Sequence, residues 1–217
     1  MDATAPLEQR LPQDLRKLFR SLKTPSAIQA YLDSLPYRAE ELDRSPLQVM
    51  TDGQAHCLDG GIFAALALWR LGFRPLILDL VPAPGTDDDH VLALFQVDGA
   101  WGALAKSNYP ILRYREPVHR SLRELVMTYF EFFFNLQKEK TLRAYTRPLD
   151  LSRFRDPSWM WDAAGIRQIS KQFYSLKPIP LIPETSAGRL QLSDERSYAA
   201  GTYGVDFNWS FGQRKNP

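Results

Sequence analysis

Cysteine is nearly absent from this chain: only Cys57 occurs among its 217 residues. A single cysteine cannot form an internal disulfide, and it cannot supply the several thiolates of a structural zinc site. Side-chain packing must therefore hold the fold together, and the purpose of the one thiol becomes the first question about function.

Long apolar runs are missing as well. The longest, IFAALALW at residues 62–69, is far shorter than the ~20 residues that span a bilayer. The first residues, MDATAPLEQRLPQDLRK, are acidic and polar where a secretory signal is basic and then apolar. We therefore expect a soluble protein in the reducing cytoplasm, with no membrane partner.

Charge of one sign is not in excess, because 27 Lys and Arg residues face 25 Asp and Glu residues, for a formal net charge of +2. Such a balance creates no field that attracts nucleic acid. The segment KSNYPILRYREPVHRSLRE interleaves basic residues with tyrosine, but Glu116 and Glu124 dilute its charge. We interpret it as a salt-bridged surface, with His119 in solvent, and expect no nucleic-acid partner.

The chain does have enough apolar material for one core, with 44% hydrophobic residues. We predict one domain over residues 1–217. A helical pattern runs from Pro12 to Leu22, and Thr24 is the predicted N-cap of a second helix. Residues 57–71 form the most apolar predicted helix, which Gly72 ends.

Strand patterns follow this helix. RPLILDLV (residues 74–81) predicts one strand, and HVLALFQV, DG and AWGALAKS (residues 90–107) predict a hairpin. Helical patterns return at residues 121–135 and 157–174. Beyond residue 182 no helical period is present, and the aromatic residues there predict that part of the segment docks on the body.

Two residues of this layout suggest chemistry. Cys57 opens the apolar helix, where unpaired backbone N–H groups favour a thiolate, and His90 opens a neighbouring strand. A thiol on a helix start beside an imidazole is the arrangement of Cys-His hydrolases. Gly60 and Gly61 would let backbone or substrate approach the helix.

These stretches resemble the transglutaminase-like branch of the papain-like cysteine hydrolases. CLDGGIFAALALWRLGFRPLIL matches its Cys-opened helix and following strand, and DHVLALFQVDGAWGAL matches its His-opened hairpin with a Trp. The resemblance covers about residues 53–108 and implies Cys57 as nucleophile and His90 as base. The implied fold is α+β: a buried Cys-bearing helix packed on a small antiparallel sheet, with flanking helices.

The family's usual third residue, an Asp, corresponds here to Ala105. A two-residue hairpin loop would place Ser107 opposite His90, and a three-residue loop would place Asn108 there. We favour Asn108, whose carbonyl can fix the imidazole tautomer, and retain Ser107 and, more remotely, Asp89 as alternatives.

Further roles are assigned around the pair. Gln54, three residues before the cysteine, is a candidate oxyanion donor, and Trp101 a candidate substrate contact. His56 should point away from the thiol, as a rim residue. The spacing of His56, Cys57, Asp59 and His90 does not favour a metal, and no phosphate or dinucleotide motif suggests a cofactor, so none of either is expected.

The sequence thus predicts a thiol-dependent acyl-transfer enzyme, a hydrolase or an amidotransferase, whose substrate is a peptide, a protein or a small amide or ester. The motif-bearing core spans about residues 45–136, with a helical N-terminal cover (1–44) and a C-terminal extension (137–217). The alternative is an inactive module of the same fold that binds a peptide or protein partner in the cleft, which Ala105 favours. Neither the substrate nor the oligomeric state follows from the sequence.

Overall fold

The computed structural model describes residues 4–40 and 42–213. Its helices, in chain order, are α1 (Ala5–Glu8), α2 (Gln13–Ser21), α3 (Pro25–Ser34), α4 (Pro46–Asp52), α5 (Cys57–Arg70), α6 (Leu122–Phe130), η1 (Leu151–Arg153), η2 (Pro157–Met160), α7 (Ala163–Phe173), α8 (Glu184–Ala187), α9 (Glu195–Gly201) and η3 (Phe207–Trp209). Its strands are β1 (Leu76–Pro82), β2 (His90–Val97), β3 (Ala100–Leu104), β4 (Arg115–His119), β5 (Leu142–Tyr145), β6 (Leu149–Asp150) and β7 (Ile179–Pro180).

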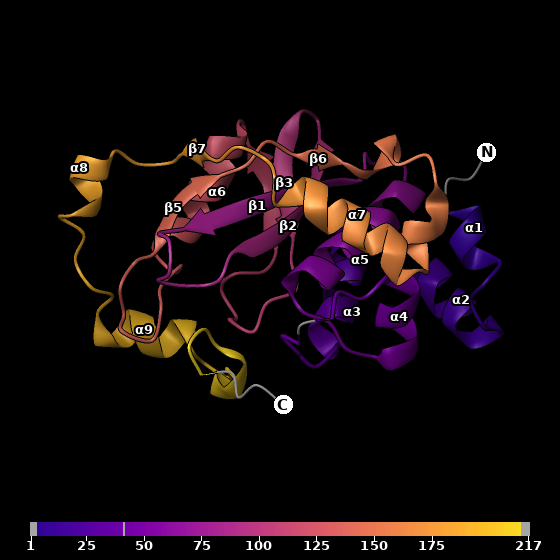
Figure 1. Cartoon of the computed structure of the whole chain (residues 1–217), viewed down its shortest axis with the longest axis horizontal. Helices are drawn as coiled ribbons and strands as arrows, with labels where there is room; N and C mark the ends of the chain where they lie inside the picture. The colour runs from indigo at the N-terminus through magenta and orange to yellow at the C-terminus, as the bar shows by residue number, and fades with distance from the viewer. Residues whose placement is uncertain (1–3, 41, 214–217) are drawn as a thin grey trace.

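The strands of the described residues form one antiparallel sheet in the order β4-β3-β2-β1-β5-β7, and β6 pairs with β1. The N-terminal helices gather at one end of the molecule and α8 and α9 at the other (Figure 1). The predicted α+β class, with a buried Cys-bearing helix on a small antiparallel sheet and flanking helices, is confirmed.

Side chains of β2 alternate between two apolar layers. Val91 and Phe95 face the layer built around α5, and Leu92 and Leu94 face the layer that contains Tyr129 of α6. Because residues two apart in a strand share a face, the sheet separates the helix that carries Cys57 from α6.

Gly60 and Gly61 of α5 allow the helix to pack closely on the sheet. A Cβ on Gly61 would lie 2.7 Å from Cγ1 of Val91, and one on Gly60 would lie 2.2 Å from Cβ of Lys106. Glycine at these positions lets the helix backbone approach the sheet more closely than any side chain would allow.

Local signals placed several helix starts correctly. The Thr24 hydroxyl accepts the Ala27 N–H at 3.1 Å, and the Ser121 hydroxyl accepts the Glu124 N–H at 3.1 Å. The helix predicted to continue to residue 135 instead ends at Phe130, and the aromatic residues after it enter the core from a turn.

The C-terminal segment differs from the prediction. It contains the short helices α8 and α9, although the sequence there has no helical period. The Asp194 carboxylate accepts the N–H groups of Arg196 and Ser197 and so starts α9. A helix of two turns is too short to show periodicity, so capping is its main sequence signal.

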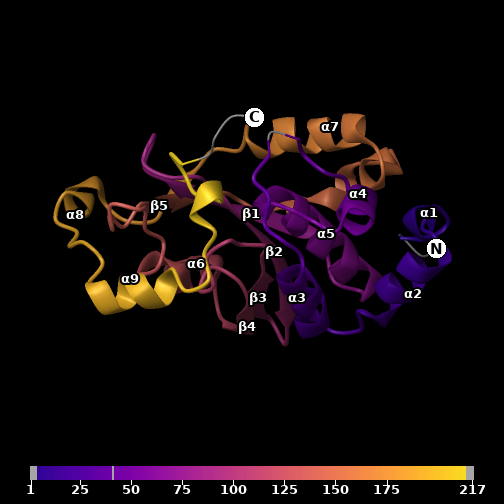
Figure 2. The ribbon, with the colours of Figure 1, turned by 90° about the horizontal axis from the view of Figure 1, so that it is seen from below.

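After α9 the chain turns back from the end of the molecule toward its middle (Figure 2). Docking of this segment was predicted from its aromatic residues, and Trp209 does lie beneath the Arg38 guanidinium, 5.3 Å from its ring centre. Tyr203, in contrast, is 82% exposed. Among the described residues, no helix combines the length and apolar character needed to cross a membrane.

Candidate active site

Cys57 is the first residue of α5, and the polar residues around it fix the helix start. The Asp59 carboxylate accepts the His56 N–H at 3.2 Å, and the His56 ring accepts the Leu58 N–H through Nδ1, also at 3.2 Å. The first-turn amide of Cys57 has no intrahelical partner, because helix geometry leaves the first N–H groups unpaired. It can therefore donate to a ligand.

His56 was expected at the rim, and it does line the cleft of the thiol, but it is more buried than a rim residue in solvent would be. The residue is 8% exposed and is the N-cap of α5. Because Nδ1 accepts the Leu58 N–H, the proton resides on Nε2, which lies 3.2 Å from Asp59 and 3.4 Å from Asp43. The side chain therefore caps the start of α5.

The thiol faces a cleft of about 170 Å³. Its lining residues are Tyr37, Ala39, Glu40, Asp43, His56, Cys57, Asp88, Asp89 and Tyr174. The sulfur donates to the carbonyl oxygen of Asp89 at 3.9 Å, a weak contact with the residue directly before His90.

Burial and neighbouring carboxylates raise the pKa of the Cys57 thiol well above its ordinary value, Asp89 having the largest effect among the carboxylates. The sequence suggested the opposite, since a helix start favours a thiolate. The resting thiol is therefore protonated at neutral pH.

A pair of buried acids lies beside the thiol. Burial, together with Asp89, raises the pKa of Asp79 to about 8. Oδ1 of Asp79 and Oδ2 of Asp89 are buried and have no hydrogen-bond partner among the described residues. Burial and the closeness of neighbouring carboxyls raise the pKa of both, so the pair retains a proton at neutral pH.

His90 begins β2, and its ring is held by the backbone. Nε2 lies 2.7 Å from the carbonyl oxygen of Leu112. A carbonyl only accepts, so Nε2 carries the proton and Nδ1 remains as the acceptor nitrogen. Burial lowers the pKa of His90 to about 4, so the imidazole is neutral at pH 7.

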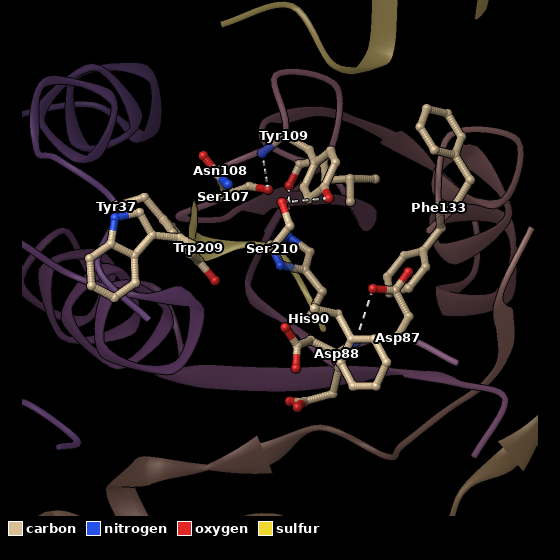
Figure 3. A pocket seen from close by; sticks show the side chains of 14 residues that line it. Tyr37, Asp87, Asp88, His90, Ser107, Asn108, Tyr109, Phe133, Trp209 and Ser210 are labelled. Atoms are coloured by element: carbon tan, nitrogen blue, oxygen red, sulfur yellow. Dashed lines mark hydrogen bonds between the residues drawn. The ribbon is translucent and has the colours of Figure 1, made fainter. Parts of the chain in front are cut away.

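Cys57 and His90 line adjoining cavities. The cavity at His90 is about 40 Å³ in volume, and Figure 3 shows it between the 87–90 segment, the corner at Ser107 and the C-terminal segment. Tyr37, Asp88 and Asp89 contribute to both cavities. Among the described residues no hydrogen bond joins the thiol to the imidazole, since each is bonded to a backbone carbonyl.

The hairpin has the two-residue loop, because Val97 pairs with Ala100. The pairing of β2 with β3 ends at Ala93 and Leu104, before Ser107, but Ser107 does line the cavity at His90. Its hydroxyl accepts the Tyr109 N–H at 3.0 Å.

Asn108 lines the same cavity, but its carboxamide is bonded to the backbone of Asp206. Ala105 is buried and pairs through its backbone with Gln29. The group that orients His90 in the structure is thus the Leu112 carbonyl.

Two further candidates lie away from the thiol cleft. Gln54 lies in the link between α4 and α5 and is not among the residues that line the cleft. Trp101 pairs with Gln96, six residues along β2 from His90 and therefore about 20 Å away along the strand. The structure does not bring either residue together with the Cys57 sulfur.

His119, expected in solvent, is 9% exposed, and its Nδ1 lies 3.1 Å from the Trp101 carbonyl. It therefore serves as a structural histidine between β3 and β4. The expected salt-bridged surface is also only partly present: Arg113 pairs with Asp33, but Lys106 is buried.

Donor atoms of Asp43, His56 and Asp59 lie within 4.8 Å of one another, the geometry of a possible cation site. The Asp59 oxygens, however, already accept the N–H groups of Arg44 and His56, and the Arg44 guanidinium lies 3.9 Å away. The charge of that carboxylate is thus already compensated, and the cluster serves the helix start.

Sequence reasoning missed two groups of the site, the Leu112 carbonyl and the Asp79 carboxyl. A backbone carbonyl, such as that of Leu112, can be supplied by any residue type, so no pattern identifies it. Asp79 did have a signal, because an acid within the apolar run LILDLV is unusual for a buried strand.

No protein-family model matches the chain, and no curated protein matches it. Among solved structures the chain is similar to Legionella pneumophila LapG, at 18% sequence identity and a TM-score of 0.35, with 47% of this chain and 67% of that chain covered. EGTA-treated Legionella pneumophila LapG matches at 15% identity and a TM-score of 0.36, with 92% of each chain covered. At these scores the account of fold and site rests on the chain's own geometry.

Proposed function

We propose that the chain is a thiol-dependent acyl-transfer enzyme that acts on an amide or ester carbonyl, with Cys57 as nucleophile and His90 as base. The observation that carries the proposal is the tautomer of His90. Its Nε2–H is held by the Leu112 carbonyl, which leaves Nδ1 ready to accept a proton, while the thiol contacts the preceding residue. In this role the Leu112 carbonyl does what the family's third residue does.

The reaction starts from a neutral pair, since both groups are uncharged at pH 7. The Cys57 sulfur attacks the carbonyl carbon as its proton passes to Nδ1 of His90, and the Cys57 N–H stabilises the oxyanion. The imidazolium then protonates the leaving amine or alcohol as the bond to the acyl carbon breaks. Water or an amine resolves the thioester, which returns the thiol.

The resting structure sets one condition on this mechanism. Asp88 and Asp89 line both cavities, and no hydrogen bond joins the thiol to the imidazole among the described residues, so the mechanism includes a shift of this segment or a bridging water. A reducing cytoplasmic location also belongs to the proposal, because the nucleophile must stay reduced.

Acylation by p-nitrophenyl acetate tests the proposal. We expect release of p-nitrophenolate with formation of a Cys57 thioester, identified by peptide mass spectrometry, and none in Cys57→Ala. The variant His90→Gln should acylate roughly 100-fold more slowly or worse, the usual contribution of a general base. His119→Gln, which changes a buried histidine remote from the cleft, is the matched control and should keep the wild-type rate.

A wild-type acylation rate in His90→Gln, with an unchanged circular dichroism spectrum, would reject His90 as the base. The second candidate function, an inactive module that binds a peptide, would then be favoured. Its specific support is the Asn108 carboxamide, which holds a backbone segment next to His90 and leaves the imidazole to the Leu112 carbonyl.

A further inference from the structure

Asn108 makes a two-point contact with the C-terminal segment. Its Nδ2 donates to the Asp206 carbonyl at 2.9 Å, and its Oδ1 accepts the Asp206 N–H at 3.1 Å. A carboxamide has the same donor and acceptor as a peptide group, so it can pair with one extended residue as a neighbouring strand would. Asp206 has the extended conformation that this requires, with φ −85° and ψ 98°. The contact therefore recognises the peptide backbone and is indifferent to the side chain.

Further contacts extend this recognition along the segment. The hydroxyls of Tyr109 and Ser210 are 3.0 Å apart, and Arg38 lies over the Trp209 ring and 4.0 Å from the Asp206 carboxylate. Trp209 and Ser210 close the cavity that His90 lines (Figure 3). A segment bound in this way covers the proposed base.

The contacts are of a kind that can open. Arg38 and Asp206 are exposed by 36% and 46% in their side chains, and exposed ion pairs contribute at most about 1 kcal/mol. Gly204, with φ +73°, provides a turn from which the segment can swing.

We propose that the corner at Asn108 and Tyr109, together with Arg38, is a binding subsite for a peptide with one extended residue followed by a tight turn, which residues 205–211 of the same chain, with Asp206 extended and η3 after it, occupy in the resting protein. An external peptide then binds by displacing this segment. The inference rests on the proposed function only in taking that peptide to be the substrate, and binding can be measured without catalysis.

The test uses the full chain with its C-terminal segment released by Asp206→Pro and Trp209→Ala. Proline removes the N–H that Asn108 accepts and tolerates the φ of this residue. The probe is a fluorescein-labelled peptide of residues 203–213, YGVDFNWSFGQ, followed by fluorescence anisotropy. The released variant should bind the peptide at least tenfold more tightly than the wild-type chain.

Two matched variants locate the binding. Tyr203→Ala changes an exposed residue of the same segment and should bind the peptide as weakly as the wild type does. Adding Asn108→Asp to the released variant exchanges the Nδ2 donor for a carboxylate and should weaken binding at least tenfold. Trp209→Ala alone replaces the double variant if circular dichroism shows that the latter does not fold.

Equal peptide binding by wild-type and released chains would overturn the proposal, and so would tight binding that survives Asn108→Asp. Cys57→Ser in the released background should bind the peptide unchanged. Acylation thus tests the proposed function, and peptide anisotropy tests the subsite. Either proposal can fail while the other holds.

Discussion

At the scale of single residues, the Cys57 sulfur experiences two opposing effects. A helix start stabilises an anion by about 0.3–1 kcal/mol, which is less than one pKa unit. Burial and the carboxylates of Asp88 and Asp89 act in the other direction and outweigh it. The position of a cysteine at a helix start thus predicts one effect that lowers its pKa. Burial and the surrounding charges decide the net shift of that pKa.

The Asp79 carboxyl should make stability depend on pH. Its folded-state pKa of about 8 lies above the unfolded value, so the folded state binds more protons and the free energy of unfolding falls as pH rises toward and through 8. We expect a loss of about 1–2 kcal/mol between pH 6.5 and 8, measured by urea denaturation. Asp79→Asn should remove most of this dependence.

Two other groups contribute weakly between pH 6.5 and 8: Lys106, whose pKa burial lowers to about 8, opposes the effect of Asp79, and Asp59, whose pKa burial raises to about 6, adds to it. Burial lowers the pKa of His90 to about 4, so the unfolded state binds its proton first, and the contribution of His90 to stability rises with pH only up to about 6.5. Asp156→Asn, a change at an exposed acid, is the matched control and should keep the wild-type slope. An equal slope in Asp79→Asn would contradict a retained proton on this carboxyl.

At the scale of elements, α5 depends on its close approach to β2. A methyl group at Gly61 would lie 2.7 Å from the Val91 side chain, which is short and cannot swing away. We expect Gly61→Ala to lower the free energy of unfolding by about 1–3 kcal/mol, the usual cost of overpacking, although alanine favours helix. Chemical denaturation measures the loss.

Gly188→Ala is the control for this prediction, because its Cβ would enter open space and its φ is −69°. It should change stability by less than about 1 kcal/mol. A Gly61→Ala chain as stable as the wild type would show that the helix and strand can move apart without cost.

At the scale of the whole molecule, α3 is joined to the sheet by two buried polar side chains. The Gln29 carboxamide pairs with the N–H and the carbonyl of Ala105 at 3.1 and 3.0 Å. The Lys106 amine donates to the carbonyls of Leu32 and Leu35, just where the negative end of the α3 dipole lies. Helix α3 is therefore an integral cover of the end of β3 that leads to Ser107.

Gln29→Leu should destabilise the whole fold by about 2–4 kcal/mol, because it leaves two buried backbone groups of Ala105 without partners. Thermal and urea unfolding should both show the loss. Gln137→Leu, at an exposed position, should stay within about 0.5 kcal/mol of the wild type. If Gln29→Leu also stays within that range, the cover does not depend on this contact.

Much of the fold could be predicted from local sequence. The apolar run after Cys57 is buried as a helix, and the DG dipeptide forms the tight turn of the hairpin, with φ +50° at Asp98 and +79° at Gly99. Thr24 and Ser121 begin helices as their residue types favour. These features were predictable because each depends on residues within a few positions of one another.

The sequence by itself determined that a single thiol would open a buried helix beside a strand that begins with histidine. Only the tertiary structure decided which groups surround that thiol and that imidazole. Leu112 bonds the His90 ring through its backbone carbonyl, Asp79 raises the pKa of the thiol from the neighbouring strand, and Asp206 pairs with Asn108 from the C-terminal segment. The register of the sheet and the packing of the C-terminal segment on the body bring such groups together. The spacing of residues along one segment encodes neither of them.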